Sequence, residues 1–195
     1  MVADFWPGEN RWTPLAVRLA VHPDWEVQEW AVYPFASLLE DDLTRGLHRV
    51  ADLARRPEPG VRRAVVVAVK VLAARKLPSG PAPLLGLLDS LLEEEDEYVR
   101  RNLGPFSVGD GLLRAYPRET LEALKQWASR EAWSARWNVA MAFTAAAAAK
   151  HPEEVAAILA QLETDQRKEV RSAVRKARAA LFRRLRGDER FRQGS

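Results

Sequence analysis

Apolar residues recur at helical spacing through most of the chain, and the stretch from Glu26 to Leu39 is a clear case. Its apolar positions are Val27, Trp30, Ala31, Pro34, Phe35 and Leu38. The i, i+3, i+4 pattern predicts an amphipathic helix. Pro34 lies inside this pattern, and because proline lacks a backbone donor and clashes one turn back, it predicts a kink in the helix.

Similar patterns divide the rest of the chain into helices that are separated by proline, glycine and polar residues. The expected helices cover residues 15–21, 26–39, 41–55, 61–75, 81–93, 97–116, 117–128, 133–150, 153–162 and 168–185. The β-branched content of 61–75 favours a strand locally, but the length of the run favours a buried helix. No stretch predicts a strand, so we expect an all-α fold.

A short motif recurs at the start of every second long helix. It centres on an apolar residue that is followed in most copies by arginine. Aligned on Val27, Val61, Val99, Ala135 and Val170, the copies are 34, 38, 36 and 35 residues apart. A period in this range is typical of helical repeat arrays. We therefore predict one domain, 1–195, built as an α-α superhelix (solenoid) of about five helix pairs with a concave groove.

The two ends of the chain differ from the repeats. Residues 1–14 hold aromatic residues among prolines and a glycine, and we expect them to form an irregular cap over the open end of the array. Residues 186–195 are polar, and we expect a frayed tail.

Composition excludes several classes of protein. The chain has no cysteine, which excludes disulfides and thiolate metal sites. The N-terminal residues do not resemble a secretory signal, and the apolar stretch from Val139 to Ala149 is shorter than the ~20 residues that span a bilayer. We expect a cytoplasmic monomer without a membrane partner.

Charge is distributed unevenly between the two kinds of helix, although the net charge is only +3. Residues 61–76 carry five bases and no acid, whereas residues 81–96 carry five acids and no base. A basic inner face with an acidic outer face is typical of a groove that binds a polyanion. The alternative is that each motif arginine pairs with an acid of a neighbouring repeat and holds the array together.

Known catalytic motifs are absent from the sequence. It has no glycine-rich phosphate loop, no Gly-x-Ser-x-Gly and no His-Glu-x-x-His, and we expect neither a metal nor a cofactor. Two pairs at i, i+4 remain: Phe106 with Asp110, and Trp133 with Trp137. A carboxylate beside an aromatic ring could stabilise a developing cation, and the rings could stack on bases. Alternatively, the rings belong to the core and Asp110 pairs with an arginine.

Several segments resemble the DNA alkylation-repair family of HEAT-like repeat proteins. They are Asp24-Trp25-Glu26-Val27, Val99-Arg100-Arg101, Arg114-Ala115-Tyr116-Pro117 and Trp133-Ser134-Ala135-Arg136-Trp137. The resemblance covers most of residues 20–182, through motifs that HEAT repeats share in general. It implies a glycosylase that excises cationic alkylated bases with a Trp-x-x-x-Asp pair, an arginine and a second tryptophan. The matching residues are Phe106, which replaces the first tryptophan, Asp110, Arg136 and Trp137.

These observations give two hypotheses. The first is a solenoid that binds duplex DNA, as an excising glycosylase with Asp110 as its catalytic carboxylate or as a relative that only binds. Its DNA-contacting residues would be Arg62, Arg63, Arg100, Arg101, Trp133, Arg171 and Arg175, with Arg136 and Trp137 at the lesion. The alternative is a protein-interaction scaffold without catalysis, whose groove holds an acidic segment of a partner protein.

Overall fold

The computed structural model describes residues 12–41 and 43–193, with side chains for residues 13–39 and 46–186. Within these ranges every regular element is helical, which confirms the predicted all-α class. The elements are α1 (Trp12–Ala20), α2 (Trp25–Trp30), α3 (Val32–Asp41), α4 (Leu43–Ala54), α5 (Pro59–Arg75), α6 (Ala82–Asp89), α7 (Glu97–Asn102), η2 (Leu103–Leu113), α8 (Pro117–Trp127), α9 (Trp133–Ala142), η3 (Ala146–Lys150), α10 (Pro152–Leu162) and α11 (Lys168–Gln193).

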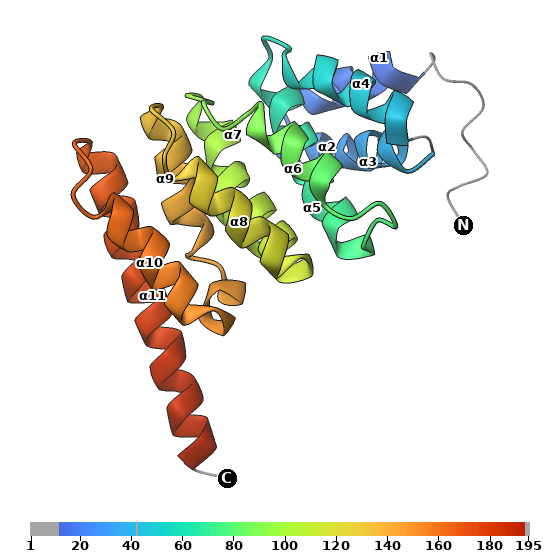
Figure 1. Ribbon diagram of the computed structural model, residues 1–195. Helices are drawn as coiled ribbons and strands as arrows, with labels where there is room; N and C mark the ends of the chain where they lie inside the picture. The colour runs from blue at the N-terminus through green and yellow to red at the C-terminus, as the bar shows by residue number, and fades with distance from the viewer. Residues whose placement is uncertain (1–11, 42, 194–195) are drawn as a thin grey trace.

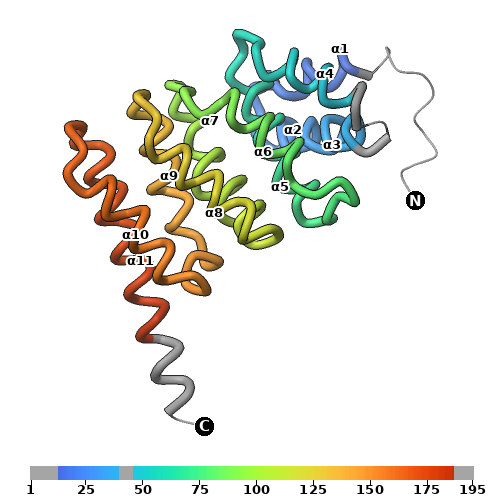
Figure 2. Tube along the Cα trace, viewed as in Figure 1, coloured from blue at the N-terminus to red at the C-terminus, as the bar shows by residue number. Residues whose placement is uncertain are grey.

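Five helix pairs follow one another along the array in chain order (Figures 1 and 2). The helices that carry the repeated motif are α2, α5, α7 with η2, α9 and α11. They pack side by side, together with α3, which follows α2, and we call them the Val-Arg layer. Their partners are α1, which packs on α2 and α3, and α4, α6, α8 and α10, and we call these five helices the second layer. Apolar residues of both layers make one continuous buried core, so the repeat solenoid predicted from the sequence is confirmed.

Helix α5 occupies the centre of the first half of this core. Nine of its residues are buried, including Val65, Val66 and Val69, because the helix is covered on several sides. Its neighbours are α3, α4, α7 and η2. The valine-rich run is therefore a buried helix, as its length indicated, and tertiary packing overrides the local preference for strand.

The helix predicted over 26–39 is divided at Ala31 into α2 and α3. The break lies at the turn that precedes Pro34. Proline at position 34 cannot donate to the carbonyl of Trp30, and its ring pushes against that carbonyl. The helix is therefore interrupted close to the predicted position by one residue, Ala31, whose backbone stays in the right-handed helical region.

The central motif helix continues without a break from α7 into η2, an eleven-residue π-helical segment. The glycines that interrupt this stretch in the sequence permit close packing on both sides. A Cβ on Gly104 would lie 2.6 Å from the carbonyl oxygen of Asn138, and one on Gly109 would lie 2.5 Å from that of Ala142. A Cβ on Gly111 would lie 3.1 Å from the Cα of Lys70. The segment thus contacts α9 through two glycines and α5 through the third.

Three predicted boundaries are wrong. Helix α6 ends at Asp89, and α9 ends at Ala142 before the separate turn of η3. Helix α11 continues to Gln193, so most of the expected tail 186–195 is helical. The proposed N-terminal cap, 1–14, lies mostly outside the described residues, and its last three residues belong to α1. No helix in the described part of the chain is long and apolar enough to span a membrane.

Candidate functional site

The repeated motif places one polar side chain at the same point of each repeat, where it closes the turn before its own helix. The residues are Gln28, Arg62, Arg100, Arg136 and Arg171. Each donates to a backbone carbonyl five or six residues earlier in the chain. The Nη1 of Arg62, for example, lies 2.7 Å from the carbonyl oxygen of Arg56 and 2.8 Å from that of Pro57. The register predicted from the sequence is therefore the register of the structure.

Two of these arginines also join one repeat to the next. Arg62 donates through Nε and Nη2 to Glu94, and Arg136 donates in the same way to Asp165. The carboxylates are almost buried, with side-chain exposures of 8% for Glu94 and 5% for Asp165. The hydrogen bond to Glu94 raises the pKa of Arg62. These bidentate pairs, which we call inter-repeat clamps, hold consecutive repeats together.

The clamps change the interpretation of the motif arginines. Arg62, Arg136 and Arg171 were expected to contact DNA, but their guanidinium groups are engaged by carbonyls and, in the first two, by a carboxylate. Removing them from these partners would leave nearly buried groups unpaired, which is costly. Nothing in the structure supports duplex DNA as their ligand. Their contacts agree instead with the alternative from the sequence, in which the motif arginines hold the array together.

The clamp at Asp165 predicts a dependence of stability on pH. Burial opposes ionisation of Asp165, but hydrogen bonds from Arg136 and from the Arg167 amide outweigh it, so its pKa is lowered. A carboxyl whose folded pKa is depressed contributes stability above its unfolded pKa, and this contribution is lost as the pH falls through the folded value.

We therefore expect the stability difference between the wild type and Asp165→Asn to be largest near neutral pH and to shrink below about pH 4. Urea unfolding of both proteins across this range measures it. A difference that stays constant down to pH ~2 would show that Asp165 is not held ionised by the fold.

The other predicted basic residues have different surroundings. Arg63 pairs with Glu29, and its guanidinium lies 5.1 Å from the ring centre of Tyr98. Arg101 forms an exposed pair with Glu97 on its own helix. Arg175 is exposed on α11 and makes no ion pair with any residue that the structure describes. Of the six arginines expected to bind phosphates, only Arg101 and Arg175 are exposed to solvent.

Phe106 and Asp110 both lie on η2, next to a lysine that the sequence analysis did not select. The Nζ of Lys70 in α5 is 3.1 Å from the ring centre of Phe106. Burial lowers the pKa of Lys70, an effect that the charge of Asp110 partly offsets. The sequence signal for Lys70 is its position as the one charge in the apolar run from Ala64 to Ala74.

The residues that the family resemblance places in a lesion site each have a different partner in the structure. Asp110 lies beside Lys70, Arg136 is held by Asp165, and Trp137 packs against Arg100. No contact found among the described residues joins Asp110 to Arg136 or to Trp137. Within the same residues, no group of three or more metal-binding side chains could hold a metal ion.

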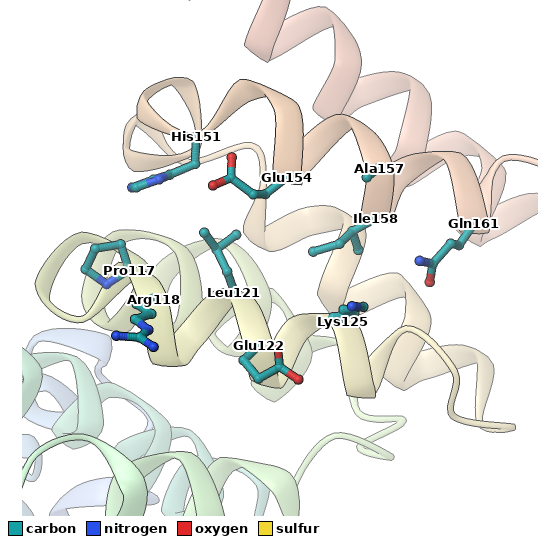
Figure 3. A pocket seen from close by; sticks show the side chains of 10 residues that line it. All are labelled: Pro117, Arg118, Leu121, Glu122, Lys125, His151, Glu154, Ala157, Ile158 and Gln161. Carbon is teal, nitrogen blue, oxygen red and sulfur yellow. The ribbon is translucent and has the colours of Figure 1, made fainter.

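A cavity of about 430 Å³ lies between α8 and α10 in the second layer (Figure 3). Its apolar lining comes from Pro117 and Leu121 of α8 and from Ala157 and Ile158 of α10. The volume is within the usual range of ligand sites, about 300–1,000 Å³. This cavity is on the layer opposite to the one in which the sequence predicted a groove.

The rim of this cavity carries charges of both signs. Figure 3 shows Arg118, Glu122 and Lys125 along α8, and Glu154 on α10. None of the four forms an ion pair within the described part of the chain. An apolar floor with unpaired charges around it is suited to a ligand that combines apolar and charged groups.

Comparisons with known proteins give only a general likeness. No protein-family model matches the chain, and no curated protein matches it. Similar solved structures include an engineered protein from a structural genomics consortium, with 16% identity, a TM-score of 0.40, and coverage of 85% of this chain and 79% of that one. A designed armadillo repeat protein in complex with the peptide (KR)4 has 17% identity, a TM-score of 0.40, and coverages of 85% and 80%. Nothing found supports the resemblance to the alkylation-repair family.

Proposed function

We propose that the chain is a non-catalytic interaction scaffold, which holds a segment of a partner protein in the cavity between α8 and α10. The observation that carries this proposal is the cavity itself, with its apolar floor and four unpaired rim charges. Leu121 and Ile158 offer contact area for apolar side chains of the partner. The rim charges then fix the register of the segment.

The mixed signs at the rim favour a protein segment over a nucleic acid. A phosphate backbone presents one sign of charge at every step and would be repelled by Glu122 and Glu154. A peptide can place acids near Arg118 and Lys125, and a base near Glu154. Arg118 and Lys125 are seven residues apart, which is about 10 Å along a helix, so two acids separated by that distance would suit them.

Selection from a displayed random peptide library, with the purified chain as bait, tests the proposal. Affinities of the selected peptides are then measured by fluorescence anisotropy. Ala157→Glu places a charge in the apolar lining, and we expect it to weaken binding by at least tenfold, or about 1.4 kcal/mol. Ala157 is exposed, so the substitution should be tolerated by the fold.

Ala160→Glu is the matched control, because Ala160 is also exposed on α10 but does not line the cavity. Its affinities should stay within about twofold of the wild type. The proposal fails if no peptide is enriched, or if the selected peptides bind both variants equally. It also fails if duplex DNA binds more tightly than every selected peptide at physiological salt.

A further inference from the structure

The inter-repeat clamps share one geometry, in which the carboxylate stands three residues before the first residue of the next motif helix. Glu94 accepts from the amide of Asp96 at 2.8 Å, and Asp165 accepts from the amide of Arg167 at 2.8 Å. Each also accepts from the arginine of the preceding repeat. In these two cases the same position of the following repeat supplies an acid to a motif arginine.

At this position the fourth repeat has a base instead of an acid. Its residue is Arg130, which turns away to the second layer and lies 2.7 and 2.8 Å from the carboxylate oxygens of Asp89. Arg100, the motif arginine of the preceding repeat, consequently has no carboxylate partner in the described residues. Its one hydrogen bond there is 3.4 Å long, to the carbonyl oxygen of Glu95.

Two indole rings take up the space around Arg100. Its guanidinium carbon lies 4.7 Å from the ring centre of Trp133 and 4.8 Å from that of Trp137. Its Nε is buried and has no acceptor among the described residues. The rings fix the plane of the guanidinium and reduce its hydration, which strengthens its attraction for an anion.

We propose that Arg100, held between Trp133 and Trp137, binds a carboxylate that is supplied by a partner protein. The arriving group would take the role that Glu94 and Asp165 play inside the chain. Carboxylate is the chemistry that the array itself selects at this position, since both completed clamps use one. The site is in the Val-Arg layer, so it does not depend on the cavity between α8 and α10.

Two sources of carboxylate can be distinguished with labelled peptides and the full chain. One probe is a fluorescein-labelled oligoglutamate with an amidated C-terminus, which offers only side-chain carboxylates. The other is a labelled Gly-Ser peptide with a free C-terminus, which offers only the terminal one. The probe that binds identifies the source. If neither binds, the proposal is overturned.

Arg100→Gln should weaken binding of that probe by at least about tenfold, and Arg100→Lys by several-fold, because lysine lacks the guanidinium fork. Arg101→Gln is the matched control. It removes the same charge from the next, exposed residue and should change the affinity by less than about twofold. Equal losses in the Arg100 and Arg101 variants would indicate general attraction to basic residues and contradict the proposal.

A second pair of variants supplies the missing acid within the chain and does not alter Arg100. Arg130→Glu and Arg130→Gln both lose the pair with Asp89, but only the first places a carboxylate at the clamp position. We expect Arg130→Glu to bind the probe at least tenfold more weakly than the wild type does. Arg130→Gln should keep the affinity of the wild type. Equal binding by the two would overturn the proposal, as would duplex DNA binding through Arg100 while both peptides fail.

Discussion

The Arg136→Gln variant should be less stable than the wild type by about 3 kcal/mol, since breaking a nearly buried ion pair from one side leaves the other charge unpaired. Asp165, with 5% of its side chain exposed, is the charge that would remain. Arg136 also closes its own turn through the carbonyls of Arg130 and Glu131, and glutamine cannot reproduce all of these bonds. Urea unfolding, followed by circular dichroism, measures the change.

Arg101→Gln is the control for the loss of one arginine. Its pair with Glu97 is exposed, with side-chain exposures of 71% and 65%, and exposed pairs contribute only about 0–1 kcal/mol. If Arg101→Gln lowers the unfolding free energy as much as Arg136→Gln does, then net charge, and not the clamp, explains the effect.

Gly109→Ala should destabilise the protein by about 1–3 kcal/mol, because it inserts a methyl group into a closed contact between η2 and α9. The added carbon would lie 2.5 Å from the carbonyl oxygen of Ala142 and 2.7 Å from the Cβ of Ala145. Backbone atoms cannot rotate away as a flexible side chain can. The two helices would have to separate, and thermal unfolding should show a lower midpoint.

Gly86→Ala should change the stability in the opposite direction to Gly109→Ala. Gly86 is exposed within α6, and nothing lies within 4 Å of a Cβ built on it. Alanine is favoured over glycine in a helix by about 0.5–1 kcal/mol, so this variant should be slightly more stable than the wild type. If Gly109→Ala were more stable than the wild type, as Gly86→Ala should be, the contact between η2 and α9 would be looser than the structure indicates.

The repeat register could be predicted from the sequence because it depends on local signals. Apolar spacing, prolines and glycines at the turns, and the recurring motif all act within one or two helical turns. The motif position proved to be the structural one, with Gln28, Arg62, Arg100, Arg136 and Arg171 closing equivalent turns. These signals were sufficient for the helix pairs and their order.

Features that depend on contacts between repeats were not predictable in the same way. The glycines of η2 looked like interruptions of a helix, whereas they allow it to approach α5 and α9 closely. Here packing between helices outweighs the local preference.

The candidate site shows the same limit. Sequence composition identified a basic set of helices but could not decide whether their arginines face a ligand or a neighbouring repeat. The sequence did contain a signal for the clamps, because Glu94 and Asp165 occupy the same position, three residues before the first residue of a motif helix. Lys70 and the cavity between α8 and α10 depend on contacts between repeats, which composition does not reveal.

A double-mutant cycle of Arg136→Gln and Asp165→Asn tests most directly whether motif arginines hold the repeats together. Unfolding free energies of the wild type, both single variants and the double variant are compared. We expect a coupling of at least about 1.5 kcal/mol, so the double variant loses much less than the sum of the single losses. Single losses that simply add would contradict the clamp and leave Arg136 available for a ligand.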